Sequence, residues 1–250
     1  MPRSRLDVAL VARGLAMSRE RAQALILAHQ VTVNGRPSNK AGAPVDDADD
    51  VQLKAPDHPW VSRGGLKLVH ALDAFGIDVT GLIALDIGAS TGGFTDVLLT
   101  RGAARVVALD VGHNQIDWKL RTDPRVTVIE GANARYLDDA HGPQLPADTR
   151  QFGIITIDVS FISLAHILPV VPSRLAPGGR VVALVKPQFE AGRDDVGKGG
   201  IVRDPAVHDR VVAAVTHTAA EVGLQRVGLA PSPIEGAEGN REFLLCLALA

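Results

Sequence analysis

Short apolar runs alternate with longer segments of helical pattern from about residue 65 to the end of this 250-residue chain. The short runs are mostly apolar and are read as strands, with helical segments between them. We expect strands near 82–87, 105–111, 126–130, 153–158, 180–186, 225–230 and 242–249, with helices near 65–75, from about 92, and near 115–121, 164–175 and 205–222. Because alternation of this kind is typical of a mostly parallel sheet flanked by helices, the sequence predicts an α/β fold.

Four polar residues, Lys67, Asp158, Lys186 and Glu242, lie at the ends of apolar runs or in the turns beside them. In an open α/β sheet, the ligand crevice forms at such positions. Two amines and two carboxylates that converge there can handle the proton of a poorly acidic alcohol. Taken singly, Lys67 is also consistent with a solvated helix residue and Glu242 with a surface charge. Asp158 and Lys186 follow apolar runs, where a charge would otherwise face burial.

A glycine-rich turn between the first two of these residues predicts a nucleotide-binding loop. Residues 84–95 contain a strand, a turn of small residues and the start of a helix, whose free N–H groups can contact a ligand. A phosphate-binding loop would have glycine at position 90, which is Ser90 here. Asp86 would also repel phosphate and favour a cationic ligand. An adenosine that carries a positively charged group therefore fits better than a dinucleotide, which remains the alternative.

Further residues extend this predicted cofactor site. Asp110 ends the next strand and is placed to bind a ribose diol. Asn133 and Ala134 follow the third strand. The ligand that combines these chemical features is S-adenosylmethionine. The candidate cofactor-binding residues are Asp86, Gly88, Ala89, Ser90, Gly92, Gly93, Phe94, Asp110, Val111, Asn133, Ala134 and Asp158, with helix packing as the alternative role of Gly92 and Gly93.

Residues 1–54 have a different pattern and predict a separate small α+β domain. An apolar stripe at helical spacing indicates one helix, and Ser18 is the expected N-cap of a second helix. A strand then runs into the tight turn formed by Asn34 and Gly35. The first 40 residues hold seven Arg or Lys against two acidic residues. This local excess of positive charge favours a polyanionic partner.

This domain resembles the small RNA-binding module found in a ribosomal small-subunit protein, in pseudouridine synthases and in tyrosyl-tRNA synthetases. The residues that carry the resemblance are 5–7, 18–22 and 31–35. His29 departs from the pattern, because such modules commonly have glycine there and a left-handed His costs roughly 1 kcal/mol, so this turn could differ. The resemblance implies RNA contacts by Arg5, Ser18, Arg19, Arg21 and Asn34. The alternative is a helical module with solvated arginines.

Residues 55–63 are the expected linker, and residues 64–250 the expected second domain. Prolines favour an extended linker, in which Trp60 could hold one domain against the other. A glycine-rich charged loop at 190–203 follows Lys186. We expect Arg63, Arg193, Lys198 and Arg203 to contact RNA phosphate, with a flexible solvated loop as the alternative for 190–203.

The order of the four polar residues around the loop at 86–94 resembles the FtsJ class of ribose 2′-O-methyltransferases. With the amino-terminal module, the whole chain resembles the TlyA (hemolysin A) family, to which the segments 61–65, 158–163, 186–190 and 199–205 also correspond. The resemblance implies a Rossmann-like, S-adenosylmethionine-dependent methyltransferase domain with a seven-stranded sheet. It further implies methylation of a cytidine 2′-hydroxyl in ribosomal RNA of the small subunit and often of the large subunit.

Within such a site we assign Lys186 as the base, or as the cation that stabilises the incipient alkoxide. A free lysine is mostly protonated at neutral pH, and the sequence leaves the choice open. Lys67 and Glu242 would orient the ribose and Lys186, and Asp158 would position the amine near the methyl group.

Other features narrow the class of protein. No apolar run reaches the roughly 20 residues of a membrane span, and the arginine-rich amino terminus is unlike a secretory signal. The one cysteine, Cys246, lies in an apolar run, which excludes a disulfide framework and favours a buried thiol. We expect a cytoplasmic protein that binds ribosomal RNA or ribosomal subunits, with no membrane or metal partner, as a monomer or weak dimer. A non-catalytic RNA-binding or ribosome-assembly factor is the alternative, and a membrane-lytic hemolysin is a distant third.

Overall fold

The structure, a computed structural model, describes residues 3–16, 18–54, 58–236 and 239–250. The chain divides into two compact units, Met1–Pro59 and Trp60–Ala250. The expected linker spans this division, and its residues 55–57 lie outside the described residues. Trp60 packs within the carboxy-terminal unit, where a Cβ added to Gly65 would lie 2.4 Å from the indole Cγ. The glycine at position 65 therefore makes room for Trp60.

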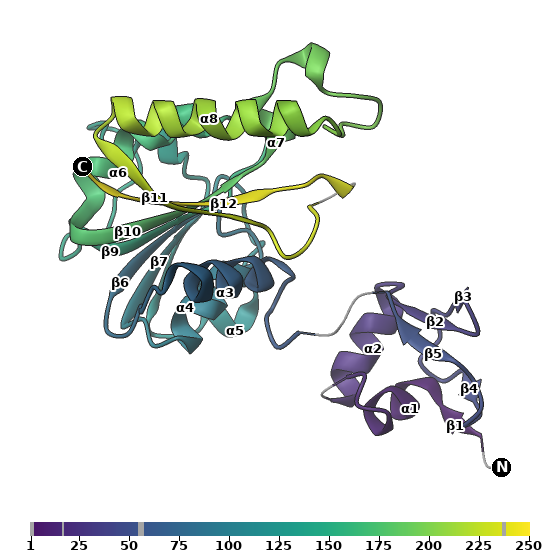
Figure 1. Ribbon diagram of the computed structural model, residues 1–250. Helices are drawn as coiled ribbons and strands as arrows, with labels where there is room; N and C mark the ends of the chain where they lie inside the picture. The colour runs from purple at the N-terminus through teal and green to yellow at the C-terminus, as the bar shows by residue number, and fades with distance from the viewer. Residues whose placement is uncertain (1–2, 17, 55–57, 237–238) are drawn as a thin grey trace. The chain divides into compact units, whose positions relative to one another are not determined.

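The amino-terminal unit is built from two helices and two small antiparallel sheets around its own apolar core (Figure 1). The helices are α1 (Leu6–Ala12) and α2 (Arg19–Leu27), and the strands are β1 (Ser4–Arg5), β4 (Pro44–Val45), β2 (Val31–Val33), β3 (Arg36–Pro37) and β5 (Val51–Leu53). Strand β1 pairs with β4, and β2 lies between β3 and β5. Leu6, Leu10 and Ile26 are among the fully buried residues of this core.

The N-cap of α2 and the turn after β2 agree with the sequence prediction. The Ser18 hydroxyl accepts a hydrogen bond from the Arg21 N–H at 3.1 Å, which confirms Ser18 as the N-cap of α2. Asn34 and Gly35 both have positive φ in the turn between β2 and β3. His29 takes the left-handed conformation with a φ of 56°, so the turn keeps this geometry although the residue is not glycine.

The carboxy-terminal unit contains one seven-stranded sheet in the order β11-β12-β10-β9-β6-β7-β8. Its strands are β6 (Ile83–Ile87), β7 (Arg105–Leu109), β8 (Val126–Ile129), β9 (Phe152–Ile157), β10 (Leu175–Val185), β11 (Leu224–Pro231) and β12 (Phe243–Leu249). The five strands from β10 to β8 run parallel, whereas β12 is antiparallel to both of its neighbours. The predicted mostly parallel α/β fold is confirmed.

Helices cover both faces of this sheet, which explains why its parallel strands are mostly apolar. Helices α3 (Gly64–Phe75), α4 (Gly93–Thr100) and α5 (Trp118–Arg121) lie on one face, and α6 (Val171–Arg174) and α8 (Pro205–Glu221) lie on the other (Figure 1). Each face has its own cluster of buried Val, Leu, Ile and Ala side chains. The short helix α7 (Pro187–Glu190) directly follows β10.

The helix expected over 164–175 is wrong as a single element. The structure has two 3₁₀ turns, η2 (Leu164–His166) and η3 (Leu168–Val170), followed by the short α6. Pro169 and Pro172 lack the N–H groups that a continuous helix would need, so the segment is divided at the prolines. Two more 3₁₀ turns, η1 (Ala134–Tyr136) and η4 (Arg193–Asp195), follow β8 and α7.

The order of the strands places a crevice between β6 and β9. From β6 the chain proceeds to β7 and β8 on one side, then crosses to β9 and continues to β10 on the other. In doubly wound sheets, ligands bind at the carboxyl ends of the two strands where this reversal occurs. Gly88 and Asp158 are the residues directly after those two strand ends.

Candidate active site

Two cavities meet at the carboxyl ends of β6 and β9. The first, of about 440 Å³, is the tetrad cavity, lined by Lys67, Asp158 and Lys186 among others. The second, of about 360 Å³, is the Asp110 cavity. The residues that line both cavities are Gly88, Ser90, Asp158 and Ser160. These four residues form the common wall of the two cavities. A ligand in one cavity and a ligand in the other would both contact this wall.

The structure brings together all four residues predicted from the ends of apolar runs. Lys67 lies in α3, and Asp158, Lys186 and Glu242 lie after β9, after β10 and before β12. Because β12 is antiparallel to β10, Phe243 pairs with Val185. This register places the start of β12 beside the end of β10, at the edge of the sheet where β9 also ends.

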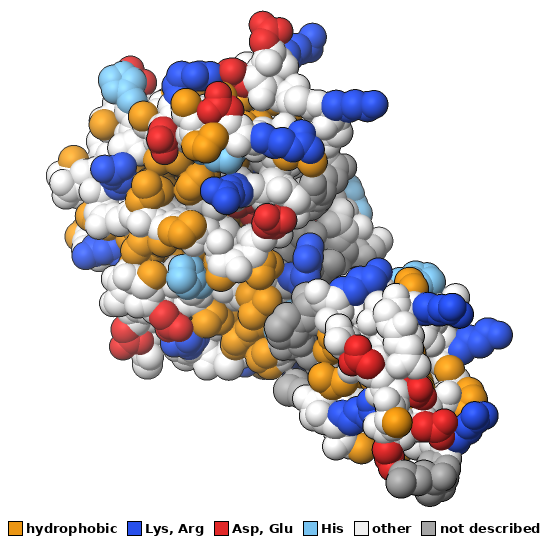
Figure 2. Space-filling model, turned by 45° about the vertical axis from the view of Figure 1, so that its right-hand side comes forward, with side chains coloured by type: hydrophobic (Ala, Val, Ile, Leu, Met, Phe, Trp, Pro, Cys, Tyr) orange, Lys and Arg blue, Asp and Glu red, His pale blue; other side chains and the backbone are white. Residues whose placement is uncertain are grey.

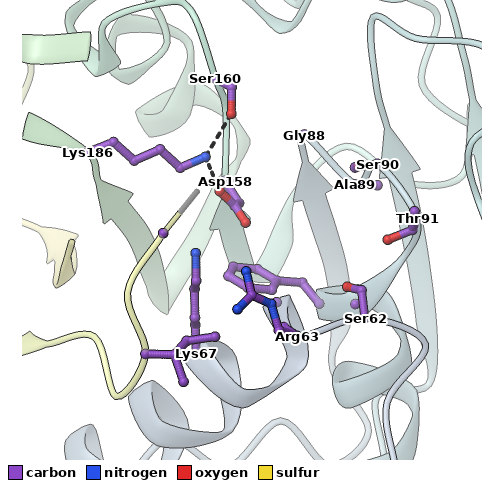
Figure 3. A pocket seen from close by; sticks show the side chains of 15 residues that line it. Ser62, Arg63, Lys67, Gly88, Ala89, Ser90, Thr91, Asp158, Ser160 and Lys186 are labelled. Carbon is purple, nitrogen blue, oxygen red and sulfur yellow. Dashed lines mark hydrogen bonds and ion pairs between the residues drawn. The ribbon is translucent and has the colours of Figure 1, made fainter. Parts of the chain in front are cut away.

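These four residues form two ion pairs, of which Figure 3 shows the one between Lys186 and Asp158. Lys67 Nζ contacts the Glu242 carboxylate, and Lys186 Nζ lies 2.6 Å from Asp158 Oδ1. Lys186 Nζ also donates a hydrogen bond to Ser160 Oγ at 2.8 Å. Lys67, Lys186 and Glu242 are buried. A buried charge is tolerated when an opposite charge and hydrogen bonds compensate it, and each lysine has such a partner here.

Gly88 is required where the two strands approach each other. Its φ is 82°, and a Cβ at this position would lie 2.5 Å from the carbonyl oxygen of Asp158. The N–H of Asp158 donates to the carbonyl of Ile87 at 2.9 Å, so the ladder between β6 and β9 continues up to this point. Only glycine fits this conformation and this close approach.

Asp110 holds the glycine-rich turn and borders the second cavity. Its carboxylate accepts hydrogen bonds from the N–H of Ser90 at 2.8 Å and from the N–H of Gly112 at 2.7 Å. Each oxygen keeps a second acceptor site. Leu109, Ala132, Asn133 and Ala134 also line this cavity. A partly apolar cavity with a carboxylate among its lining residues fits an adenosine, from whose ribose hydroxyls the carboxylate could accept hydrogen bonds.

Most of the predicted cofactor residues line the cavities. Gly88, Ala89, Ser90, Gly93, Phe94 and Asp158 line the tetrad cavity, and Asp110, Val111, Asn133 and Ala134 line the Asp110 cavity. Gly92 does not line either one: a Cβ there would lie 2.3 Å from the Leu120 side chain. The alternative role in helix packing, left open for Gly92 from the sequence, agrees with this position.

Asp86 does not face a ligand, contrary to the prediction from sequence. It is 0% exposed, and its two oxygens accept hydrogen bonds from the hydroxyls of Thr95 at 2.7 Å and Thr156 at 2.8 Å. The side chain of a strand residue points to one face of the sheet, and here that face is covered by α4. Burial raises the pKa of Asp86 to about 6, against the lowering effect of both hydroxyls.

Sequence reasoning missed two cavity-lining residues of the segment after Asp158. Ser160 lines both cavities and contacts Lys186, and Phe161 lines the Asp110 cavity. Phe161 is 90% exposed with a φ of 63°, and its ring lies 5.0 Å from that of Phe189. The sequence signal that could have identified both residues was their position, shortly after Asp158 at the end of an apolar strand.

Two of the predicted RNA-contacting residues of the amino-terminal unit, Arg5 and Arg19, contact one buried carboxylate. Arg5 donates two hydrogen bonds to Asp7, each at 3.0 Å, and Arg19 donates a third at 3.0 Å. Asp7 is fully buried, and the Arg5 guanidinium, followed by the other donors, holds the pKa of that carboxyl far below its usual range. Asp7 thus fixes two half-exposed guanidinium groups side by side.

The other predicted RNA contacts of this unit have structural partners of their own. The Ser18 hydroxyl caps α2, and Arg21 lies half-buried in its first turn. Asn34 donates to Asp49 Oδ1 and accepts from the Asp50 N–H, both at 2.8 Å. Figure 2 shows Lys and Arg side chains interspersed with acidic ones on the visible face of this unit.

The predicted RNA contacts of the carboxy-terminal unit are exposed. Arg63 lines the tetrad cavity, and Arg193, Lys198 and Arg203 lie on the segment between α7 and α8. Of the described helices, none is long and apolar enough to cross a membrane. Within the same described residues, no group of three or more His, Cys, Asp or Glu side chains is placed to hold a metal ion.

Comparisons with known proteins agree with this geometry. Residues 60–249 match the FtsJ-like methyltransferase family, and residues 4–51 match the S4 domain. The chain is 47% identical over 247 residues to the 16S/23S rRNA (cytidine-2′-O)-methyltransferase TlyA of Mycobacterium tuberculosis, covering 98% of this chain and 90% of that protein. It is 43% identical to Hemolysin A of Brachyspira hyodysenteriae, over 96% of this chain and 98% of that protein.

A solved structure also resembles the whole chain. It is that of a candidate hemolysin from Streptococcus thermophilus, with a TM-score of 0.74 and 46% identity over 100% of this chain and 90% of the other. Fold, cavities and family match together define an S-adenosylmethionine-dependent methyltransferase with an amino-terminal S4 RNA-binding domain. The chain belongs to the TlyA (hemolysin A) family of FtsJ-like methyltransferases.

Proposed function

We propose that this protein transfers a methyl group from S-adenosylmethionine to the 2′-hydroxyl of a cytidine in ribosomal RNA. The small-subunit RNA is the first target and the large-subunit RNA a further one, in line with the name of the M. tuberculosis relative. One observation carries the proposal: Asp158 lines both cavities, and Lys186 Nζ, which lines the tetrad cavity, lies 2.6 Å from Asp158 Oδ1. A donor in one cavity and a ribose in the other would react beside this pair.

The chemistry requires alignment and the removal of one proton. S-adenosylmethionine supplies an already activated sulfonium methyl group. The ribose 2′-oxygen forms a bond to the methyl carbon as the carbon–sulfur bond breaks, and the hydroxyl proton leaves. A ribose hydroxyl is a weak nucleophile, so catalysis depends on in-line positioning and on a group that deals with this proton. Lys186 is that group, as the base or as the cation beside the developing alkoxide.

The other tetrad residues hold Lys186 and the sugar in place. Asp158, which lines both cavities, would fix the Lys186 ammonium in the tetrad cavity. Lys67 and Glu242 form a buried pair, and Lys67 itself lines the tetrad cavity. In this pair the Lys67 amine is a fixed donor for ribose oxygens. Because Glu242 carries the opposite charge, the pair adds no net charge to the site. The Asp110 carboxylate would bind the ribose hydroxyls of the donor on the opposite side of the wall.

RNA recognition divides between the two units. In this proposal residues 1–54 form the RNA-binding domain, 55–63 the linker and 64–250 the methyltransferase domain. Arg5 and Arg19, both held by Asp7, present a fixed pair of guanidinium groups suited to phosphate oxygens. The proposed phosphate contacts near the active site are Arg63, Arg193, Lys198 and Arg203. We further propose a monomer or weak dimer that acts in the cytoplasm, where ribosomal subunits are assembled.

Ribose-methylation mapping tests this function. Ribosomal RNA from cells with and without the protein is compared by sequencing that detects resistance to alkaline cleavage 3′ to each nucleotide. We expect a cytidine to lose its 2′-O-methyl group in the deletion strain and to regain it with the wild type, but not with Asp158→Ala. An unchanged map in the deletion strain would favour a non-catalytic RNA-binding or ribosome-assembly factor.

A further inference from the structure

A hydroxyl group outside the predicted tetrad contacts its central lysine. Lys186 Nζ donates to Ser160 Oγ at 2.8 Å while it lies 2.6 Å from Asp158 Oδ1 (Figure 3). Ser160 also lines both the tetrad cavity and the Asp110 cavity. The amine is thus held between two oxygens from neighbouring residues of the same loop. Ser160 accepts a hydrogen bond from one of the three N–H donors of the ammonium group, and Asp158 Oδ1 is an ion-pair partner rather than a hydrogen-bond acceptor, so N–H donors remain for the cavity.

The loop that carries Ser160 is fixed at both of its ends. At its start, the Asp158 N–H donates to the carbonyl of Ile87 at 2.9 Å. At its end, the Glu190 carboxylate accepts from Ser163 Oγ at 2.6 Å and from the Leu164 N–H at 2.8 Å.

Glu190 belongs to α7, the helix that begins directly after Lys186. The same helix therefore fixes both the end of the Ser160 loop and the residue that Ser160 contacts. The left-handed conformation of Phe161, with a φ of 63°, turns the chain between these anchors. The Ser160 loop and α7 are connected through Glu190, and together they set the distance between Ser160 and Lys186.

We propose that Ser160 is a positioning residue for methyl transfer, which acts by fixing the direction of the Lys186 amine. This inference rests on the proposed function, because it concerns the same amine and the same ribose hydroxyl. Without the hydroxyl group, Lys186 Nζ keeps one fixed partner and can turn away from the reacting oxygen. The loss should fall on the rate of the chemical step, since in-line geometry is what the amine supports.

The test compares Ser160→Ala, Ser160→Thr and wild type in single-turnover methyl transfer to ribosomal RNA. A hydrogen bond to a charged group contributes enough for a loss of about 10- to 100-fold in the rate of Ser160→Ala. The Kd for S-adenosylmethionine and the KM for RNA should stay within about threefold, because the wall itself remains. Ser160→Thr keeps an oxygen at the same place and should recover most of the rate. Ser173→Ala is the matched control, since that hydroxyl donates to Asp138 away from both cavities.

A double-mutant cycle separates this role from a general structural one. In a Lys186→Ala background, Ser160→Ala should cause no further loss of rate, because the group through which it acts is gone. An undiminished rate in Ser160→Ala would overturn the inference, as would a loss confined to cofactor or RNA binding. Equal losses with and without Lys186 would also overturn it. A wild type that methylates no ribose contradicts the proposed function itself, and the inference falls with it.

Discussion

Gly88 and Asp158 approach each other so closely that a single methyl group at Gly88 would lie 2.5 Å from the Asp158 carbonyl oxygen. Gly88 starts the cofactor turn after β6, and Asp158 carries a tetrad carboxylate after β9. Both residues line both cavities. The fold therefore joins the cofactor turn to the proposed catalytic residues through direct backbone contact, at the point where the strand order reverses.

Gly88→Ala should damage both stability and cofactor binding. The left-handed backbone alone costs an alanine about 1–2 kcal/mol, and the clash with Asp158 adds to this cost. Gly178→Ala is the matched control, because Gly178 has a φ of 76° but nothing within 4 Å of an added Cβ. Urea unfolding and calorimetry with S-adenosylmethionine measure the two effects. Equal losses of stability in the two variants, with normal cofactor binding, would contradict the close approach.

The Lys67–Glu242 pair should be strongly coupled in stability. Glu242→Gln leaves Lys67 buried without its counter-charge, and breaking a buried pair from one side typically costs about 3–5 kcal/mol. The double variant Lys67→Met/Glu242→Leu removes both charges and should recover most of this loss while remaining inactive. Chemical denaturation of Lys67→Met, of Glu242→Leu and of the double variant gives the coupling energy. Additive losses would indicate that the two residues do not interact.

Asp86 should make stability depend on pH in the acid range. Its pKa of about 6 in the folded protein lies above the value near 3.9 of a free aspartate. Between these values the folded state holds a proton that the unfolded chain has released, so this residue's contribution to the free energy of unfolding falls as pH rises. Asp86→Asn removes that dependence. The free energy of unfolding of Asp86→Asn minus that of wild type should therefore be greater at pH 7 than at pH 4, by at most about 3 kcal/mol.

Unfolding in urea at several pH values measures this difference. Asp209→Asn, an exposed carboxylate on α8, serves as the control for the change of charge. A constant difference in stability between Asp86→Asn and wild type from pH 4 to pH 7 would show that Asp86 titrates normally.

Arg19→Ala should weaken RNA binding and reduce its dependence on salt. If Arg19 contacts a phosphate, its loss lowers the slope of log K against log salt by about 0.7–0.9. Asp7→Asn should weaken binding as well, because Arg5 and Arg19 lose the carboxylate that fixes them. Arg125, which pairs with Asp123 before β8, provides a control by Arg125→Ala. An unchanged salt slope in Arg19→Ala would mean that the amino-terminal unit is only a scaffold.

The fold was largely predictable because burial on both faces of the sheet makes its parallel strands mostly apolar. The positions of Lys67, Asp158, Lys186 and Glu242 at strand ends and in nearby turns then indicated a common site, since those ends meet at one edge. The pairing within the site was not predictable. Which lysine contacts which carboxylate depends on side-chain reach and on the register between β10 and β12.

Three details of the structure differ from what the pattern of apolar runs indicated or were missed by it. The alternation of side chains along β6 turns Asp86 beneath α4, so that it supports the turn from inside. Pro169 and Pro172 divide a segment whose apolar spacing had indicated one helix. Ser160 gains its importance from Lys186, which is 26 residues away and is brought near by the pairing of β9 with β10.

The central claim is that Lys186, held by Asp158 and Ser160 of the common wall, drives methyl transfer to a ribose hydroxyl. Single-turnover transfer of labelled methyl from S-adenosylmethionine to purified ribosomal subunits tests it most directly, with wild type, Lys186→Ala and Arg125→Ala compared at matched cofactor occupancy. The account predicts a product methylated on the cytidine 2′-oxygen, a rate at least about 10²-fold lower for Lys186→Ala, and an unchanged rate for Arg125→Ala. Transfer by Lys186→Ala at the wild-type rate, or a methyl group found on a base, would contradict it.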